Sequence, residues 1–215
     1  MALLSESDRQ AVRDHLVDIT DPVKLLFFTQ TIGAPETARI ARQILDEVVS
    51  VSDRITVEEI NFILDRERST AFGISHVPAI AVLKGEIDTR IRFLGAPAGY
   101  EFSALIEAIR IAGGKDSELS DDSKKLIAEH VVEPLDIQVF VTPTCPHCPK
   151  AVTLAHKMAF EHPRIHGTCV EATEFIDLSR QYHVTGVPKT IVNGKIEILG
   201  AVPEDTFVRT VLQID

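Results

Sequence analysis

A short apolar strand runs directly into two cysteines that stand three positions apart, Cys145 and Cys148. Residues 137–141 are mostly apolar and partly β-branched, which is typical of a strand buried in a sheet. Pro146 cannot continue a central strand, but it suits the first turn of a helix, where its missing N–H costs little. The stretch therefore predicts a strand, a short turn and a helix, with Cys145 as the N-cap of the helix.

This placement of the cysteines predicts redox chemistry. A sulfur at a helix N-terminus faces unpaired N–H groups and the positive end of the helix dipole, and both favour the thiolate. His147, when protonated, adds a positive charge, so Pro146 and His147 are predicted to tune the site and to make the disulfide a stronger oxidant. Cys148 follows one helical turn after Cys145, within reach of a disulfide.

Two other interpretations of the cysteine pair stay open. The same spacing occurs in half of a structural zinc site, but such a site needs four ligands. The sequence has no second pair of this kind and no regularly spaced pair of histidines beside the first, so no metal is predicted. An inert pair of thiols is the remaining alternative.

Composition limits the class of protein. The chain has 215 residues and a formal net charge of −10 without a basic run, which argues against nucleic acid or an anionic membrane as a partner. No apolar segment approaches the roughly 20 residues that span a bilayer, and the N-terminus shows no secretory signal. Because the chain has only three cysteines, it is not a disulfide scaffold. These features predict a cytoplasmic protein.

The order of elements is written twice along the chain. Each time the pattern predicts helix, strand, helix, strand, helix, strand, strand and helix, with Val12, Leu16 and Val17 on the inner face of the first helix. The polar, glycine-bearing stretch 113–120 separates the copies. We therefore expect an α/β protein of two units, residues 1–115 and 116–215, each with a mixed four-stranded sheet flanked by helices.

The second unit resembles the thioredoxin fold, because a central strand, Cys-x-x-Cys at a helix start and Val187-Pro188 before a hairpin occur in that order. Two such units in one chain resemble the glutaredoxin-like protein disulfide oxidoreductases. The resemblance implies that Cys145 attacks, that Cys148 resolves, and that Val187–Pro188 is a cis peptide bond facing the sulfurs. Val187 and Pro188 are the predicted substrate-binding residues, since the backbone of Val187 is expected to pair with the substrate chain as an added strand.

The first unit departs from this family. Members with two active sites have Cys-x-x-Cys in both units, but this chain has no cysteine before Cys145. The missing cysteines fall at Ala34 and Thr37, or at Gly33 and Glu36, depending on the alignment. The first unit is therefore expected to be a scaffold or a docking surface. A lost first site beside an intact second one also resembles the N-terminal module of the flavoprotein that reduces alkyl-hydroperoxide peroxidases.

Four residues outside the motif also carry expectations. Cys169 lies in an apolar strand and is expected to be a buried core thiol. Glu171 and Glu174 are expected to be solvated carboxylates, with a proton relay to Cys148 as the alternative. Lys189 beside Pro188 is expected either to steer acidic partners or to be merely exposed.

The predicted function is that of an enzyme, a protein disulfide oxidoreductase whose only redox group is the Cys145–Cys148 pair, with no further cofactor. Its expected partners are disulfide-containing proteins and, as electron donor, a flavoprotein similar to thioredoxin reductase. One alternative is an electron shuttle from such a flavoprotein to a peroxiredoxin. Another is a binding module whose disulfide only regulates docking.

Overall fold

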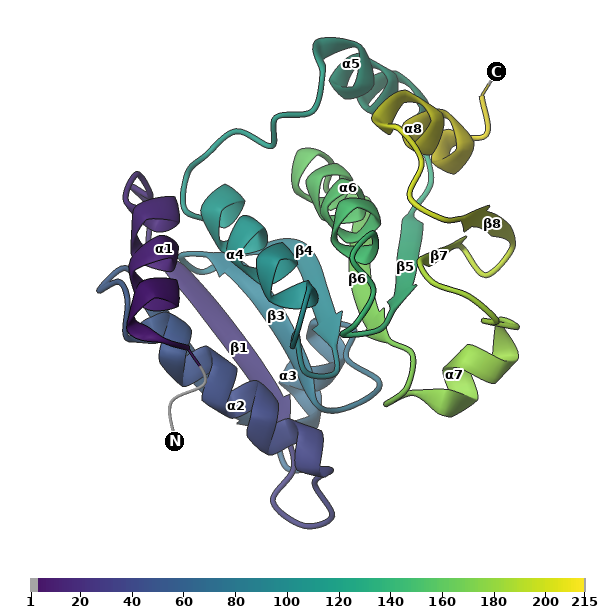
Figure 1. The fold of residues 1–215 in the computed structure, drawn as a ribbon. Helices are drawn as coiled ribbons and strands as arrows, with labels where there is room; N and C mark the ends of the chain where they lie inside the picture. The colour runs from purple at the N-terminus through teal and green to yellow at the C-terminus, as the bar shows by residue number, and fades with distance from the viewer. Residues whose placement is uncertain (1–3, 215) are drawn as a thin grey trace.

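The computed structural model describes residues 4–214, and these residues form one continuous mixed sheet with helices on both faces (Figure 1). The first half of the chain contributes four helices and four strands in the predicted order. Their bounds are α1 Glu6–Leu16, β1 Val23–Thr29, α2 Glu36–Val49, β2 Ile55–Asn61, α3 Arg66–Ala71, β3 Ala79–Lys84, β4 Ile87–Leu94 and α4 Glu101–Ala112.

The second half repeats this order. Its elements are α5 Asp121–His130, β5 Leu135–Val141, α6 Cys148–Glu161, β6 Ile165–Glu171, α7 Ile176–Gln181, β7 Lys189–Val192, β8 Ile196–Leu199 and α8 Glu204–Leu212. The predicted fold class is confirmed, since each half has a mixed four-stranded sheet flanked by helices. The unit boundary between residues 115 and 116 stays a prediction.

The two four-stranded sheets are joined edge to edge. The strand order is β2-β1-β3-β4-β6-β5-β7-β8, and β4 pairs in parallel with β6, from Ile91 opposite Gly167 to Leu94 opposite Val170. The sequence did not predict this pairing. Because the backbone ladder runs through the junction, the halves share a sheet as well as a chain.

The helices cover the two faces unequally. The apolar side chains of α1, α2, α4, α5, α6 and α8 pack into one large core on one face, and α4 and α6 lie side by side over the junction (Figure 1). The short helices α3 and α7 cover the other face with two smaller clusters. Gly167 of β6 lets α6 lie close to the sheet on the first face, because a Cβ there would lie 2.5 Å from the backbone oxygen of Ala155 in α6.

Local sequence signals explain most of the helix starts. Ser5 caps α1 through a capping box with Asp8, and Ser120 caps α5 by accepting a hydrogen bond from the Ser123 N–H. One predicted inner position is wrong. Val17 follows the end of α1 and is 73% exposed, since the helix stops at Leu16 before its next turn could bury it.

Candidate active site

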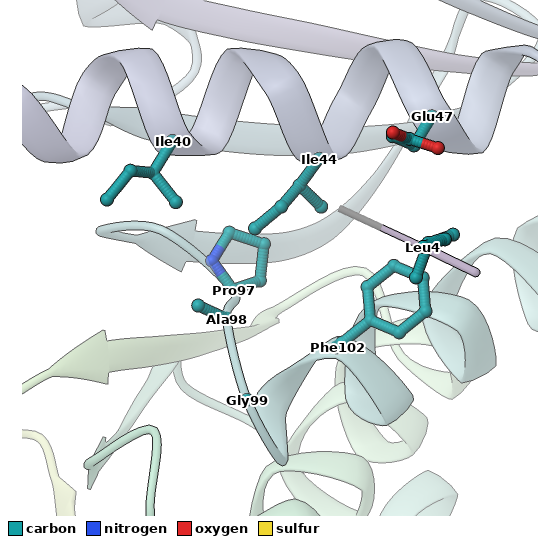
Figure 2. A pocket seen from close by; sticks show the side chains of 8 residues that line it. All are labelled: Leu4, Ile40, Ile44, Glu47, Pro97, Ala98, Gly99 and Phe102. Atoms are coloured by element: carbon teal, nitrogen blue, oxygen red, sulfur yellow. The ribbon is translucent and has the colours of Figure 1, made fainter. Parts of the chain in front are cut away.

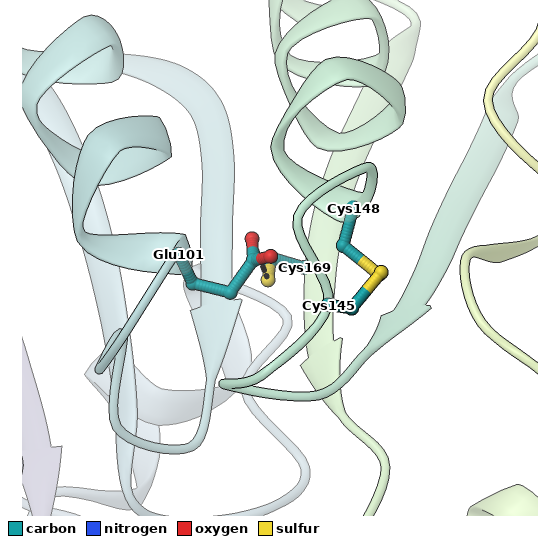
Figure 3. Close-up of a disulfide and its surroundings, with 4 residues drawn as sticks. All are labelled: Glu101, Cys145, Cys148 and Cys169. Atoms are coloured by element: carbon teal, nitrogen blue, oxygen red, sulfur yellow. Dashed lines mark hydrogen bonds between the residues drawn. A yellow bond between two sulfur atoms is a disulfide. The ribbon is translucent and has the colours of Figure 1, made fainter.

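Cys145 and Cys148 form a disulfide at the start of α6 (Figure 3). Their Cα atoms are 5.5 Å apart, inside the usual range for a disulfide. Cys145 is 9% exposed, whereas Cys148 is 0% exposed at the base of the helix. Only the first sulfur therefore lies near the surface, where another molecule can reach it.

The helix begins later than the sequence predicted. Its first residue is Cys148, its N-cap is His147, and Cys145 lies in the turn before it. Pro149 is the cause. In a helix capped by Cys145, the carbonyl of Cys145 would accept a hydrogen bond from the N–H of residue 149, but proline has no N–H. The Cys145 carbonyl instead accepts from the Cys148 N–H at 3.4 Å. Cys145 is therefore not the N-cap, although it still stands at the positive end of α6.

The Val187–Pro188 bond is cis, as the resemblance implied. Pro188 is buried and Val187 is partly exposed. Within residues 4–214 the backbone N–H and C=O of Val187 have no hydrogen-bond partner. These two groups are open to another chain, which is the property that the predicted role in substrate binding requires; that role stays a prediction.

The first half preserves the frame of this site without its sulfurs. From Val23 to Glu36 and from Leu135 to Cys148, strand start and helix start are separated by the same 13 residues. This spacing aligns Gly33 with Cys145 and Glu36 with Cys148, which decides between the two alignments left open by the sequence.

The cysteine-free half holds the loop that carries Cys145. The N–H of Tyr100 donates to the carbonyl of Pro143 at 3.0 Å. Gly99 lies so close that a Cβ there would be 2.2 Å from the same Pro143 oxygen, and its φ of +60° suits glycine. The loop before α4 is therefore a tight support for the loop between β5 and α6.

Helix α2 and the loop before α4 line a common pocket. Figure 2 shows Ile40 and Ile44 of α2 pointing toward Pro97 and Ala98, with Phe102 lower in the same pocket. The pocket has a volume of about 290 Å³ and is mostly apolar. The same loop that closes this pocket also holds the Cys145 loop, through the hydrogen bond from Tyr100 to Pro143.

A buried carboxyl group and the third cysteine meet at the junction of the halves. Glu101 is 1% exposed, and the thiol of Cys169 donates to its Oε2 at 3.7 Å (Figure 3). Burial raises the pKa of Glu101 to about 7, although the hydrogen bond from Cys169 opposes the shift. Burial, with the nearby carboxylates of Glu101 and Glu171, also raises the pKa of the Cys169 thiol well above its ordinary value.

Sequence reasoning treated Cys169 correctly as a buried thiol but missed Glu101. A glutamate in the first turn of a helix usually faces solvent and the helix dipole. Glu101 lies against Cys169 of β6, which belongs to the other half, so nothing local in the sequence marked it.

Three expectations about charged side chains are wrong. Glu171 is 3% exposed and accepts from the N–H and hydroxyl of Thr173, so it is not solvated. Glu174 is partly buried and accepts from the Ala96 N–H at 2.8 Å, across the junction, and burial raises its pKa. Lys189 is 4% exposed, donates to the Tyr182 carbonyl and pairs with Glu197, so it neither steers partners nor lies free.

The raised pKa of Glu101 has a consequence for stability. The folded protein holds the proton up to about pH 7, whereas the unfolded chain releases it near 4.5. The contribution to stability is therefore complete below pH 4.5 and is lost as the pH rises through 7. We expect Glu101→Gln to remove about 3 kcal/mol of this pH dependence, since each pKa unit corresponds to about 1.4 kcal/mol.

Urea unfolding of the oxidised protein between about pH 4 and 8.5 measures this effect as the difference between wild type and Glu101→Gln. The exposed Glu133→Gln is the matched control and should follow wild type. Parallel curves for wild type and Glu101→Gln would show that Glu101 titrates normally.

A strand, a turn with two bonded cysteines and a helix, followed by a cis-proline loop and a hairpin, define a thioredoxin-fold disulfide protein. Residues 135–213 match the model of the thioredoxin domain family. The resemblance stated from the sequence is thus confirmed, and the chain has the thioredoxin fold in two tandem units.

Two solved structures are similar to this chain over nearly its whole length. The structure of the alkylhydroperoxide reductase protein AhpF of Enterococcus faecalis matches with a TM-score of 0.90 and 25% identity, covering 97% of this chain and 99% of that one. A protein disulfide oxidoreductase from Aeropyrum pernix matches with a TM-score of 0.88 and 29% identity, covering 97% and 92%.

Sequence comparison also finds similarity to AhpF proteins. The AhpF protein of the alkyl hydroperoxide reductase of Escherichia coli is 25% identical over 193 residues, which cover 90% of this chain and 34% of the relative. The chain thus spans about a third of the length of that relative. Among residues 4–214, no helix is both long and apolar enough to cross a membrane, and no three His, Cys, Asp or Glu side chains group as metal ligands.

Proposed function

We propose that this protein is a thiol–disulfide oxidoreductase that reduces protein disulfides with the Cys145–Cys148 pair. The observation that carries the proposal is the asymmetry of the pair: two sulfurs joined in one disulfide, of which only Cys145 approaches the surface. An attacking thiol must reach its substrate, whereas a resolving thiol needs to reach only its neighbour.

The reaction starts from the dithiol. The Cys145 thiolate attacks one sulfur of the substrate disulfide, forms a mixed disulfide and releases the other substrate sulfur as a thiolate. Cys148, after losing its proton, attacks the Cys145 sulfur, which forms the internal disulfide and releases the second substrate thiolate. Two electrons pass to the substrate, and both substrate thiolates take up protons. Because the Cys145–Cys148 pair is now oxidised, a dithiol donor must reduce it before the next turnover.

The site supports this sequence at three places. The positive end of α6 stabilises a thiolate at Cys145, and the exposed His147 adds positive charge when protonated. The open backbone groups of Val187 pair with the substrate chain as an added strand, with little preference for side chains. The donor that fits is a flavoprotein disulfide reductase, and a reducing compartment such as the cytoplasm fits the three-cysteine sequence.

A second candidate function is a shuttle that passes electrons from such a flavoprotein to a peroxiredoxin. The similarity to AhpF favours it, because the match covers nearly all of this chain. A binding module with a regulatory disulfide is the non-catalytic alternative.

Insulin reduction with dithiothreitol tests the proposal. Wild type should accelerate the precipitation of insulin chains, and Cys145→Ser should reduce the rate to that of dithiothreitol alone. Cys169→Ser, which keeps both redox cysteines, is the control for loss of a thiol. A wild type without activity would rule out a general disulfide reductase and leave the shuttle and the binding module, and an active Cys145→Ser would mean that another thiol attacks.

A coupled assay separates the two catalytic candidates. Peroxide consumption is measured with a flavoprotein disulfide reductase, NADH or NADPH and a peroxiredoxin. A shuttle should accelerate peroxide consumption far more than insulin reduction, whereas a general reductase should do the reverse.

A further inference from the structure

Three large apolar side chains are exposed together in the half that has no cysteines. Ile32 is 90% exposed, Leu64 85% and Ile63 52%, and we call these three residues the apolar anchor. They line a shallow pocket of about 170 Å³ with Gln30, Thr31 and Asn61. A clustered apolar patch of this kind usually marks a contact surface, since scattered single residues are the norm elsewhere.

The anchor occupies the place where the first half would have its redox site. With the 13-residue spacing that is common to both halves, Ile32 corresponds to Thr144, the residue before Cys145. Ile63 and Leu64 follow β2 as Thr173 and Glu174 follow β6. Apolar residues thus stand in the first half where the active half has polar ones.

The anchor and the disulfide lie at the same end of one sheet. β1, β2, β4, β5 and β6 all run in one direction, while β3 and β7 run in the other. The loops after β1, β2 and β5 and the start of β3 therefore lie at the same end of the strands. Ile32 follows β1 and Cys145 follows β5, so both lie at this end of the sheet.

Open backbone groups lie next to the anchor. Val77 directly precedes Pro78 and the start of β3, the strand beside β1. Within the described part of the chain its N–H and C=O have no hydrogen-bond partner, as for Val187 in the active half. An extended peptide can therefore bind at both places through its own backbone.

The separation fits a short peptide. β1 and β5 are four strand positions apart in the sheet order, and strands are spaced by about 4.8 Å, which gives about 19 Å before twist. An extended chain rises about 3.3 Å per residue, so roughly six residues span this spacing between the two strands.

We infer that the cysteine-free half selects substrates: the apolar anchor holds a large aliphatic side chain of an extended substrate segment, about six residues from the substrate cysteine that Cys145 attacks. This inference rests on the proposed function and names its substrate class. The proposed occupant is the substrate itself, because the anchor and Cys145 lie at the same end of the strands of one sheet.

Peptide disulfides test the inference. Each peptide carries one cysteine in a mixed disulfide and either Leu-Leu or Ser-Ser about six residues away, in versions on both sides of the cysteine. With Leu-Leu on the productive side, wild type should have a KM about tenfold lower than with Ser-Ser, and an equal kcat. Ile32→Ser/Leu64→Ser should remove this difference.

The controls separate the inference from the proposed function. 2-Hydroxyethyl disulfide is too small to reach the anchor, so wild type and Ile32→Ser/Leu64→Ser should reduce it equally. Val17→Ser replaces an aliphatic residue that is 73% exposed in the segment after α1 and should keep the preference for Leu-Leu. If wild type reduces the small disulfide but shows one KM for all peptides, the anchor is not a substrate site. If wild type reduces nothing, the proposed function itself fails.

Discussion

Replacing Cys148 with serine is expected to leave the protein joined to its substrate after a single attack. Cys145 can still form the mixed disulfide, but the buried partner that would break it is gone. Turnover with insulin should fall by at least about 100-fold, since resolution then depends on external thiols. Mass spectrometry and non-reducing gels should show a covalent adduct at Cys145.

Cys145→Ser/Cys148→Ser is the control and should form no adduct. Cys169→Ser/Cys148→Ser should form as much adduct as Cys148→Ser, because Cys169 is buried beside Glu101. An adduct that persists in the double variant without Cys145 would place the attacking thiol elsewhere. Adducts recovered from a lysate by Cys148→Ser would identify the natural substrates.

Replacing Gly99 with alanine is expected to damage the redox site from the half that has no cysteines. The added Cβ would lie 2.2 Å from the Pro143 oxygen, so the loop of Cys145 or the start of α4 must move. The hydrogen bond between Tyr100 and Pro143 is then distorted. We expect a loss of about 2–4 kcal/mol in the free energy of unfolding and at least about tenfold in kcat/KM.

Gly73→Ala is a matched control for this substitution. Gly73 has a φ of +67°, close to the +60° of Gly99, but a Cβ there meets no atom within 4 Å. It should lose only the cost of the left-handed conformation, about 1 kcal/mol, and keep its kcat/KM. Equal losses in the two variants would mean that the contact with Pro143 does not support the site.

The sequence predicted the order of the helices and strands because its signals are local. Alternating apolar residues, prolines before helices and glycines in turns all act over short distances. The pairing of β4 with β6 was not predictable in this way. A buried strand shows which face it hides, but it does not show which other strand lies at its edge.

The features of the candidate site likewise differ in how far local sequence reveals them. The two cysteines were found from a contiguous motif, and the cis bond at Val187–Pro188 was implied by the family resemblance. The predicted start of α6 is too early, because Pro149 has no N–H to donate to the carbonyl of Cys145. The burial of Glu101 was not predictable, since its partner Cys169 lies in the other half. Glu171 and Lys189 have partners within eight residues, but their charge alone gave no sign that they are buried.

The shared ladder between β4 and β6 makes the inactive half difficult to discard. Removing residues 1–115 would uncover the side of β6 that now pairs with β4, leaving a central strand as a bare edge open to aggregation. It would also strip α4 from α6 and leave the loop of Cys145 without its neighbour at Tyr100. A duplicated unit without redox cysteines can therefore still be indispensable, because the fold of the other unit depends on its contacts.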